Sequence, residues 1–227
     1  QQMKDGMRVG LSWGSTIQLT LKYYHPTIPM PNARFVQLSG NVCSSVISQD
    51  GYMDGNIFVQ RFASKAQAGW SVFQVPYIVQ NTALKEMLYA EPQVRKHISQ
   101  FNKLDMALIG VGSDDPRRSV TYLSGYLSLD EAKKLVEDGM TADICGTRLT
   151  NNGRIRTTSL TNRVITIDLK DLRKVSEICA VGAGSEKATS LIAGCKGGFI
   201  KKIIVDEVCA LTIQSRLEEA EYTPPAH

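Results

Sequence analysis

The chain has 227 residues, of which 43% are hydrophobic and 21% are charged. These proportions are ordinary for a globular protein, and they exclude disorder, collagen and coiled coil as the main organisation. The net charge of +4 is too small and too evenly spread to indicate a nucleic-acid or membrane surface. No apolar run approaches the roughly 18–20 residues that cross a bilayer, so no membrane partner is expected.

The cysteines and histidines give no sign of a metal site or a cofactor. The five cysteines are far apart and contain no C-x-x-C pair, which indicates reduced, buried thiols in a cytoplasmic protein. The three histidines are equally dispersed, and none lies close in sequence to another. We therefore predict no metal, no cofactor and no catalytic residues. The cysteines are Cys43, Cys145, Cys179, Cys195 and Cys209, and the histidines are His25, His97 and His227.

Short apolar runs alternate with segments of helical period along the whole chain. This pattern is typical of an α/β fold, in which helices cover a mostly parallel, Rossmann-like sheet. A turn signal at Asn151-Asn152-Gly153 predicts a small β-hairpin insertion at 147–158. No break in composition divides residues 1–217, and residues 218–227 form a polar tail that is expected to fray. The predicted strands are 8–12, 34–37, 71–74, 106–109, 164–167, 178–181 and 203–205, and the predicted helices are 16–24, 57–66, 94–101, 129–137, 186–193 and 207–217.

Glycine-containing turns follow three of the predicted strands. At Gly14-Ser15-Thr16 the first strand runs into a helix, and the backbone N–H groups and two hydroxyls there form a potential site for a phosphate monoester. The alternative is that one of the hydroxyls simply caps the helix. The turn with Gly110 and Gly112 lacks the third glycine of a dinucleotide fingerprint, so it does not indicate a nicotinamide cofactor and could be an ordinary tight turn.

The third turn contains Gly184 and is followed by Lys187, which can reach back to an anion near the end of the strand. The alternative is a solvated lysine on the helix surface. Asp143 lies in a small apolar segment and could accept hydrogen bonds from sugar hydroxyls, or could be a turn residue. Because strand ends of this kind meet at one sheet edge, we expect an anionic ligand of phosphate or sugar size. The aromatic residues Tyr23, Tyr24, Phe58, Phe62 and Phe73 are interpreted as core rather than as a stacking platform.

Taken in order, these junctions resemble the effector-binding domain of the SorC/DeoR-type family of bacterial sugar-responsive transcriptional regulators, with the sorbose- and sorbitol-operon regulators as the nearest resemblance. The family's fold is similar to that of the phosphosugar isomerase and CoA-transferase-like group. The resemblance extends from Val9 to about Gln214. Its matching segments are the phosphate loop 12–16, an L-x-G-G-like segment at 38–41, a helix start at Gly55-Asn56, and segments at 105–112, 142–146, 182–188 and 205–210.

The resemblance implies that Gly14, Ser15 and Thr16 hold a phosphate, with Asp143 and Lys187 at the sugar end. By position it also assigns Gly40, Asn56, Gly110, Gly112 and Gly184 to the effector site. Ser39 stands where some members carry a basic residue for a second phosphate, so a monophosphate or a free sugar is favoured over a bisphosphate. The family further implies a homo-oligomer, a dimer or a tetramer.

Such regulators bind operator DNA through an N-terminal helix-turn-helix domain, which is not expected within this chain because its first strand begins by Arg8. Two alternatives remain. One is a phosphosugar isomerase or aldolase-like enzyme that uses Lys187 as acid/base or Schiff-base former and Asp143 as proton-transfer partner. The other is a purely structural dimerisation module without a ligand.

Overall fold

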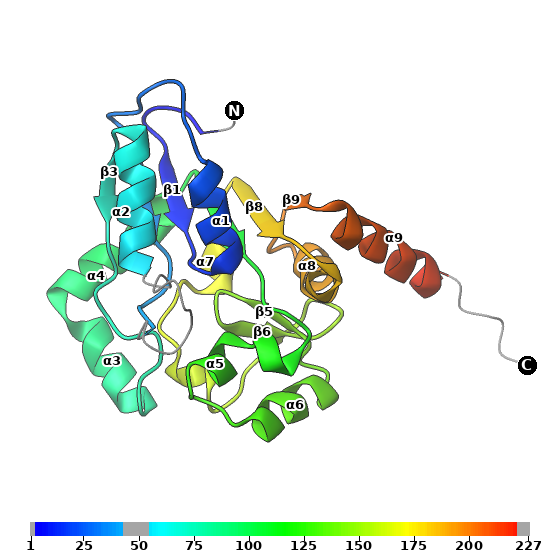
Figure 1. Cartoon of the computed structure of the whole chain (residues 1–227). Coiled ribbons are helices and arrows are strands. Elements are labelled where there is room, and N and C mark those ends of the chain that lie inside the picture. The colour runs from blue at the N-terminus through cyan, green and yellow to red at the C-terminus, as the bar shows by residue number, and fades with distance from the viewer. Residues whose placement is uncertain (1–2, 43–54, 222–227) are drawn as a thin grey trace, which may run out of the picture.

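The computed structural model describes residues 3–42 and 55–221. Its centre is a six-stranded parallel sheet with the order β3-β2-β1-β4-β8-β9, and a three-stranded antiparallel sheet, β5-β6-β7, lies near the carboxyl ends of the central strands (Figure 1). The α/β fold and the small hairpin insertion predicted from the sequence are both confirmed. The strands are β1 Arg8–Leu11, β2 Arg34–Gln37, β3 Gly69–Ser71, β4 Met106–Gly110, β5 Ala142–Ile144, β6 Thr147–Leu149, β7 Ile155–Arg156, β8 Glu177–Gly182 and β9 Lys202–Val205.

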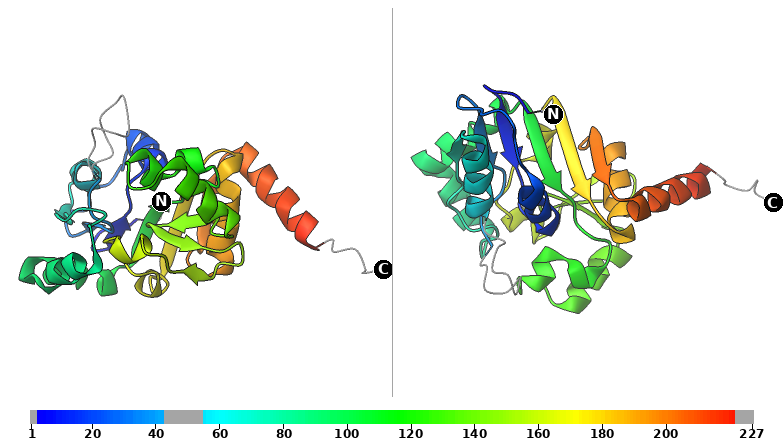
Figure 2. Two further views of the ribbon diagram at one scale, coloured as in Figure 1. Left: turned by 90° about the horizontal axis from the view of Figure 1, so that it is seen from below. Right: turned by 45° about the horizontal axis from the view of Figure 1, so that its top comes forward.

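Helices connect the parallel strands and cover both faces of the main sheet (Figure 2). The α-helices are α1 Ser15–Tyr23, α2 Gly55–Ala66, α3 Thr82–Ala90, α4 Pro92–Ile98, α5 Val120–Leu123, α6 Leu129–Glu137, α7 Leu169–Leu172, α8 Ala188–Lys196 and α9 Glu207–Glu221, and the 3₁₀ turns are η2 Phe101–Lys103, η3 Pro116–Arg118, η4 Thr161–Arg163 and η5 Ser185–Lys187. None of these helices is long and apolar enough to span a bilayer, within the ranges 3–42 and 55–221.

The order of the central strands creates a topological switch point between β1 and β4. From β1 the chain builds outward to β2 and β3, then returns to β4 and builds outward in the other direction. Connections that leave β1 and β4 in opposite directions open a crevice at the carboxyl ends of these two strands. The fold therefore provides a concave site at this position before any particular side chain is considered.

Alternate residues of each central strand face two separate hydrophobic cores. Val9, Phe35 and Leu108 pack with α1 and α2 on one face, whereas Val36 and Ile109 belong to the core on the other face. Because a parallel strand is buried on both sides, β1, β2, β4 and β8 are largely apolar along their whole length.

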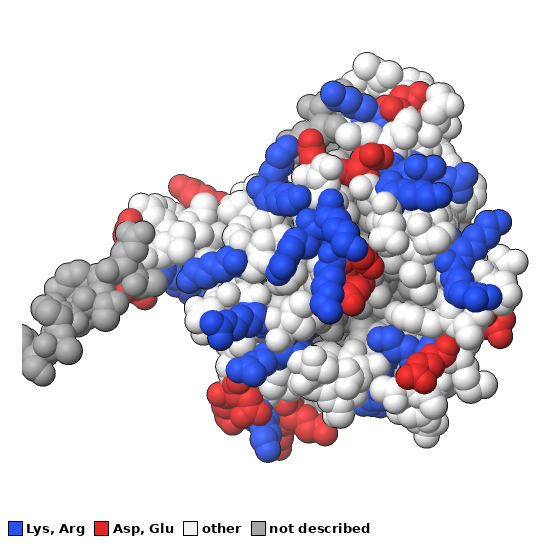
Figure 3. Space-filling model, turned by 180° about the vertical axis from the view of Figure 1, so that it is seen from behind, with Lys and Arg blue, Asp and Glu red and all other residues white. Residues whose placement is uncertain are grey.

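The face of the molecule opposite to the one in Figure 1 carries Lys and Arg side chains interspersed with Asp and Glu (Figure 3).

Several predicted elements were wrong in place or in kind. The strand expected at 71–74 lies at Gly69–Ser71, and the segment 164–167 forms only two isolated bridges, Ile78 with Val164 and Ser39 with Thr166. The helix expected at 94–101 begins at Pro92 and ends at Ile98, where a 3₁₀ turn takes over shortly afterwards. Helix α9 continues to Glu221, so the first residues of the expected polar tail are helical.

Two predictions of burial also need correction. Cys145, Cys179 and Cys209 are buried as expected, but Cys195 is exposed near the end of α8, and Cys43 lies outside the described residues. Of the aromatic residues assigned to the core, Tyr23 is 72% exposed, because it lies on the outer side of α1. The three phenylalanines Phe58, Phe62 and Phe73 are buried, and Tyr24 is half-buried.

Candidate functional site

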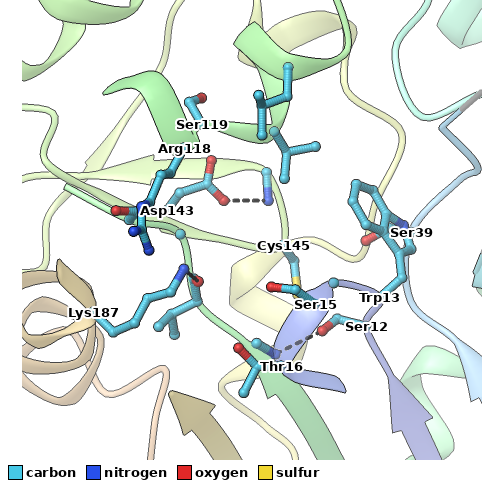
Figure 4. Close-up of a pocket in the computed structure, with 18 of the residues that line it drawn as sticks. Ser12, Trp13, Ser15, Thr16, Ser39, Arg118, Ser119, Asp143, Cys145 and Lys187 are labelled. Atoms are coloured by element: carbon cyan, nitrogen blue, oxygen red, sulfur yellow. Dashed lines mark hydrogen bonds between the residues drawn. The ribbon is translucent and has the colours of Figure 1, made fainter. Parts of the chain in front are cut away.

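A pocket of about 220 Å³ lies at the switch point, between the carboxyl ends of β1 and β4 and the small sheet (Figure 4). Its walls come from the β1–α1 junction, the turn after β4, helix α5, the β5–β6 hairpin and η5. The lining residues are Ser12, Trp13, Gly14, Ser15, Thr16, Gln18, Ser39, Tyr77, Gly110, Val111, Gly112, Ser113, Arg118, Ser119, Val120, Leu123, Asp143, Cys145, Gly146, Arg148 and Lys187.

The N-terminus of α1 forms one wall of this pocket. Gly14 is the N-cap residue, with φ 142° and ψ 165°, a conformation that is essentially restricted to glycine. Among the described residues no side chain caps the helix, so the alternative in which Ser15 or Thr16 is a cap does not hold. The first N–H groups of a helix have no intrahelical acceptor. Here they lie in the pocket wall, where they can bind an anion.

Close backbone contacts hold the turn after β4. The Ser12 hydroxyl accepts a hydrogen bond from the Gly110 N–H at 2.9 Å, which joins the ends of β1 and β4. The Gly112 N–H donates to the Asp143 carbonyl at 2.8 Å, which joins β4 to β5. A Cβ atom on Gly112 would lie 2.6 Å from the Cβ of Asp143, so only glycine allows this approach. The turn is thus part of the pocket wall, not an ordinary surface turn.

Lys187 enters the pocket from η5. Its Nζ donates to the Val111 carbonyl at 3.0 Å, and the side chain is half-buried, so the alternative of a solvated surface lysine does not hold. Burial lowers the pKa of Lys187 from its ordinary value of 10.5, and the neighbouring Glu186 partly opposes this effect. The ammonium group is therefore fixed at the end of β4 by its contact with the Val111 carbonyl.

Asp143 is held on two sides within the β5–β6 hairpin. One carboxylate oxygen accepts the Gly146 N–H at 2.9 Å, as a turn residue does, and the other lies 3.5 Å from Nε of Arg148. Arg148 is buried, and its guanidinium also donates to the hydroxyls of Ser119 and Thr121 at 3.1 and 3.2 Å. Asp143 therefore serves as a turn residue and at the same time presents a carboxylate to the pocket.

The charge of the lining is predominantly positive. Among the lining residues that the structure describes, Arg118, Arg148 and Lys187 contribute three cations against the single carboxylate of Asp143, and Arg118 is additionally paired with Glu186 outside the lining. Burial, helped by the nearby carboxylate, raises the pKa of the Cys145 thiol to about 12. That thiol is therefore protonated and unreactive at neutral pH.

Seven of the ten residues assigned from the sequence line this pocket: Gly14, Ser15, Thr16, Gly110, Gly112, Asp143 and Lys187. The other three do not. Gly40 is a packing residue, because a Cβ there would lie 2.5 Å from the Pro76 carbonyl oxygen. Gly184 is the N-cap of η5 and donates its N–H to the Asp206 carboxylate, and Asn56 lies in the first turn of α2.

Sequence reasoning missed four prominent lining residues: Trp13, Tyr77, Arg118 and Arg148. The indole N–H of Trp13 donates to the Gly40 carbonyl at 2.9 Å, and its ring meets Tyr77 edge to face at 4.9 Å. The polar loop around Arg118, directly after a strand, was a usable signal. Arg148 gave none, because an arginine in a predicted hairpin is normally exposed.

Comparison with known proteins shows the family of this chain. The family described as “Putative sugar-binding domain” matches residues 1–214. The chain is 24% identical over 217 residues to the deoxyribonucleoside regulator of Bacillus subtilis (strain 168), covering 96% of this chain and 67% of the relative. It is 26% identical over 213 residues to the transcriptional regulator LsrR of Enterobacter sp. (strain 638), covering 93% of this chain and 62% of the relative.

The full-length sorbitol operon regulator SorC of Klebsiella pneumoniae has a similar structure, with a TM-score of 0.82 and 19% identity over 93% of this chain and 67% of that one. This likeness shows a shared fold. The chain thus spans about two thirds of the length of these regulators. The resemblance inferred from the junction motifs is confirmed: the chain belongs to the family of sugar-binding domains found in SorC/DeoR-type transcriptional regulators.

Proposed function

We propose that this chain is the effector-sensing part of a regulator that binds a sugar or a sugar phosphate and controls a carbohydrate-utilisation operon. The observation that carries the proposal is the pocket itself, in which a helix N-terminus, three cations and one carboxylate meet at the switch point of the sheet. The N–H groups of Ser15 and Thr16 would bind the phosphate, and the ammonium of Lys187, which the resemblance places at the sugar end, would attract the phosphate as a cation of the same pocket. The carboxylate of Asp143 would accept hydrogen bonds from sugar hydroxyls.

A single phosphate fits the lining better than two. Ser39 contributes a hydroxyl, not a cation, and that hydroxyl is already hydrogen-bonded to Thr166 at 2.7 Å. The size of the pocket, about 220 Å³, also suits a small sugar monophosphate. We therefore favour a monophosphate, or a free sugar, over a bisphosphate effector.

The whole regulator would act in the cytoplasm as a homo-oligomer, a dimer or a tetramer, that binds operator DNA through a separate domain. The relatives are longer than this chain, and their names describe regulators, one of them a transcriptional regulator. Effector binding would shift the population between two arrangements of the subunits, and so change the spacing of the DNA-reading domains.

The lining gives little support to an enzyme with the same pocket. Lys187, the candidate acid/base, is engaged with the Val111 carbonyl, and the Cys145 thiol is protonated at neutral pH. Among the described residues no histidine lines the pocket. We infer that the chain binds its ligand without transforming it.

A thermal-shift screen against aldose and ketose sugars and their monophosphates tests both parts of the proposal. A ligand at 100 times its dissociation constant adds about 2.7 kcal/mol of apparent stability. We expect one sugar phosphate to raise Tm, with inorganic phosphate giving a smaller rise and no turnover of the stabilising compound. Consumption of that compound at enzymatic rates would contradict the sensing function, and no shift with any compound would contradict the phosphate site.

A further inference from the structure

A second concave surface lies beside α1, on the face of the main sheet that α1 and α2 cover. It is a groove of about 540 Å³ with a mostly apolar lining that includes the last two strands of the sheet. In Figure 2 the surface of β8 and β9 lies open next to α1. The residues that line the groove are Met3, Thr20, Tyr24, His25, Pro26, Thr27, Met30, Met106, Leu108, Cys179, Val181 and Ile204.

Exposed apolar side chains also lie on the elements that line this groove. Ile204, on the edge strand β9, is 57% exposed, and Leu19, Tyr23 and Ile28 are exposed on α1 and the segment that follows it. A single exposed leucine or isoleucine is normal, but a cluster around an apolar groove marks an interaction site. The groove and its rim therefore form a surface that is suited to an apolar partner.

Helix α9 carries a matching apolar stripe. It projects from the body of the molecule beyond β9 (Figures 1 and 2). One side of its first turns faces α8 through Cys209 and Ile213, and Arg216 forms an ion pair with Asp114 at 3.2 Å. On another side Val208 and Leu211, three positions apart, are 57% and 59% exposed.

The start of α9 is fixed in a direction away from the groove of its own chain. Only Asp206 separates β9 from α9, and its carboxylate accepts the N–H groups of Cys209 at 2.9 Å and Gly184 at 3.1 Å. With this clamp and the Arg216–Asp114 ion pair in place, α9 cannot fold back over β8 and β9. The stripe on α9 and the groove therefore remain separate exposed surfaces on one chain.

We propose that the two surfaces meet in a homodimer, in which α9 of each copy lies in the groove of the other. A reciprocal contact of this kind satisfies twofold symmetry, because the same pair of surfaces is used twice. The charges on the two surfaces are complementary: Glu218 and Glu219 on α9 are exposed, and so is Lys4, next to the lining residue Met3. The 15 residues of α9 extend about 22 Å, long enough to place the apolar stripe and the acidic turn on one partner.

This inference rests on the homo-oligomer of the proposed function, but not on effector sensing. A monomeric protein that is still stabilised by its sugar phosphate would overturn the inference and leave the sensing function intact. Conversely, a dimer that binds no sugar phosphate would leave the inference intact and contradict the sensing function.

The test is the oligomeric state of the purified 227-residue chain, measured by light scattering coupled to size-exclusion chromatography. We expect a species of twice the 25.0 kDa mass of one chain. Leu211→Glu and Ile204→Lys should each weaken dimerisation by at least about tenfold, since each places a charge in an apolar contact. Ile155→Glu, at an exposed apolar position on β7, is the matched control and should leave the dimer unchanged.

Mixing the Leu211→Glu and Ile204→Lys variants distinguishes reciprocal exchange from pairing of α9 with α9. In a mixed dimer one contact joins a wild-type groove to a wild-type α9, and the other joins the introduced glutamate to the introduced lysine, so dimers should reappear on mixing. Circular dichroism of each variant confirms that it is folded. A monomeric wild-type chain, a dimer insensitive to Ile204→Lys, or failure of the mixture to dimerise would each overturn the proposal.

Discussion

Lys187 is the residue whose titration should be visible in effector binding. Burial lowers its pKa below the ordinary 10.5, so it loses its proton at a lower pH than an exposed lysine does. The cation is the form that attracts a phosphate, and the affinity should therefore fall as pH rises through this lowered pKa. Isothermal titration of the sugar phosphate between pH 7 and pH 10 measures the fall.

The variants of Lys187 separate its charge from its packing. Lys187→Met should weaken binding of the sugar phosphate by about 10- to 100-fold, the usual effect of losing one charge-assisted hydrogen bond. The same change should leave the free energy of unfolding equal or higher at pH 7, because burial of the charged ammonium opposes folding. Lys187→Arg keeps its charge throughout this range, so any binding that it retains should no longer depend on pH. A pH-dependent loss in that variant would contradict the role of Lys187.

Gly14 and Gly110 offer a matched pair of glycines in the same pocket. Gly14 has φ 142°, so Gly14→Ala should destabilise the protein by about 1–3 kcal/mol and displace the start of α1. Gly110 needs no left-handed backbone, and a Cβ there would only touch Ile17 at 3.7 Å. Gly110→Ala should therefore cost little. Urea unfolding of the two variants compares them directly, and equal stabilities would contradict the assignment of the Gly14 conformation.

At the scale of elements, Arg148 connects the small sheet to α5. Its guanidinium contacts Asp143 of β5 and the hydroxyls of Ser119 and Thr121, and it is 5% exposed. Arg148→Met leaves these groups without their shared donor, which should cost about 3 kcal/mol. Arg156→Met is the control. Arg156 lies opposite Arg148 in the register of β6 and β7, but its side chain is exposed. Chemical unfolding measures both, and a similar small loss in each would contradict the bridging role.

The elements that could be predicted from the sequence are those whose buried residues give a recognisable apolar pattern. Strands β1, β2, β4 and β8 are buried on both faces, and their limits were predicted to within one or two residues. Helix α3 was not predicted; none of its residues is fully buried, and Leu88 and Tyr89 pack against the core only in part. The segment 164–167 is apolar because Val164, Ile165 and Ile167 are buried, yet its backbone makes only isolated bridges. Burial alone does not distinguish such a segment from a strand.

The residues of the candidate site also divide into those that the sequence predicts and those that it does not. Residues in turns directly after strands, such as Gly14, Gly112 and Lys187, could be assigned because the fold class brings strand ends together. Gly40 and Gly184 resembled them in sequence, but serve close packing and the start of a turn. Arg148 could not be found, because its burial depends on partners 27 and 29 residues away in a separate segment.

At the scale of the whole molecule, the pocket lies between two bodies: the main sheet supplies Gly14 and Gly110, and the small sheet with α5 supplies Asp143 and Ser119. A ligand that contacts both bodies stabilises their contact, and so protects the amides near their junction more than those elsewhere. Hydrogen exchange with and without the stabilising sugar phosphate should show added protection at 119–127 and 142–149. The amides of α3 and α4, away from the pocket, are the internal control. Equal protection throughout the chain would mean that the ligand only opposes global unfolding and does not stabilise the contact between the two bodies.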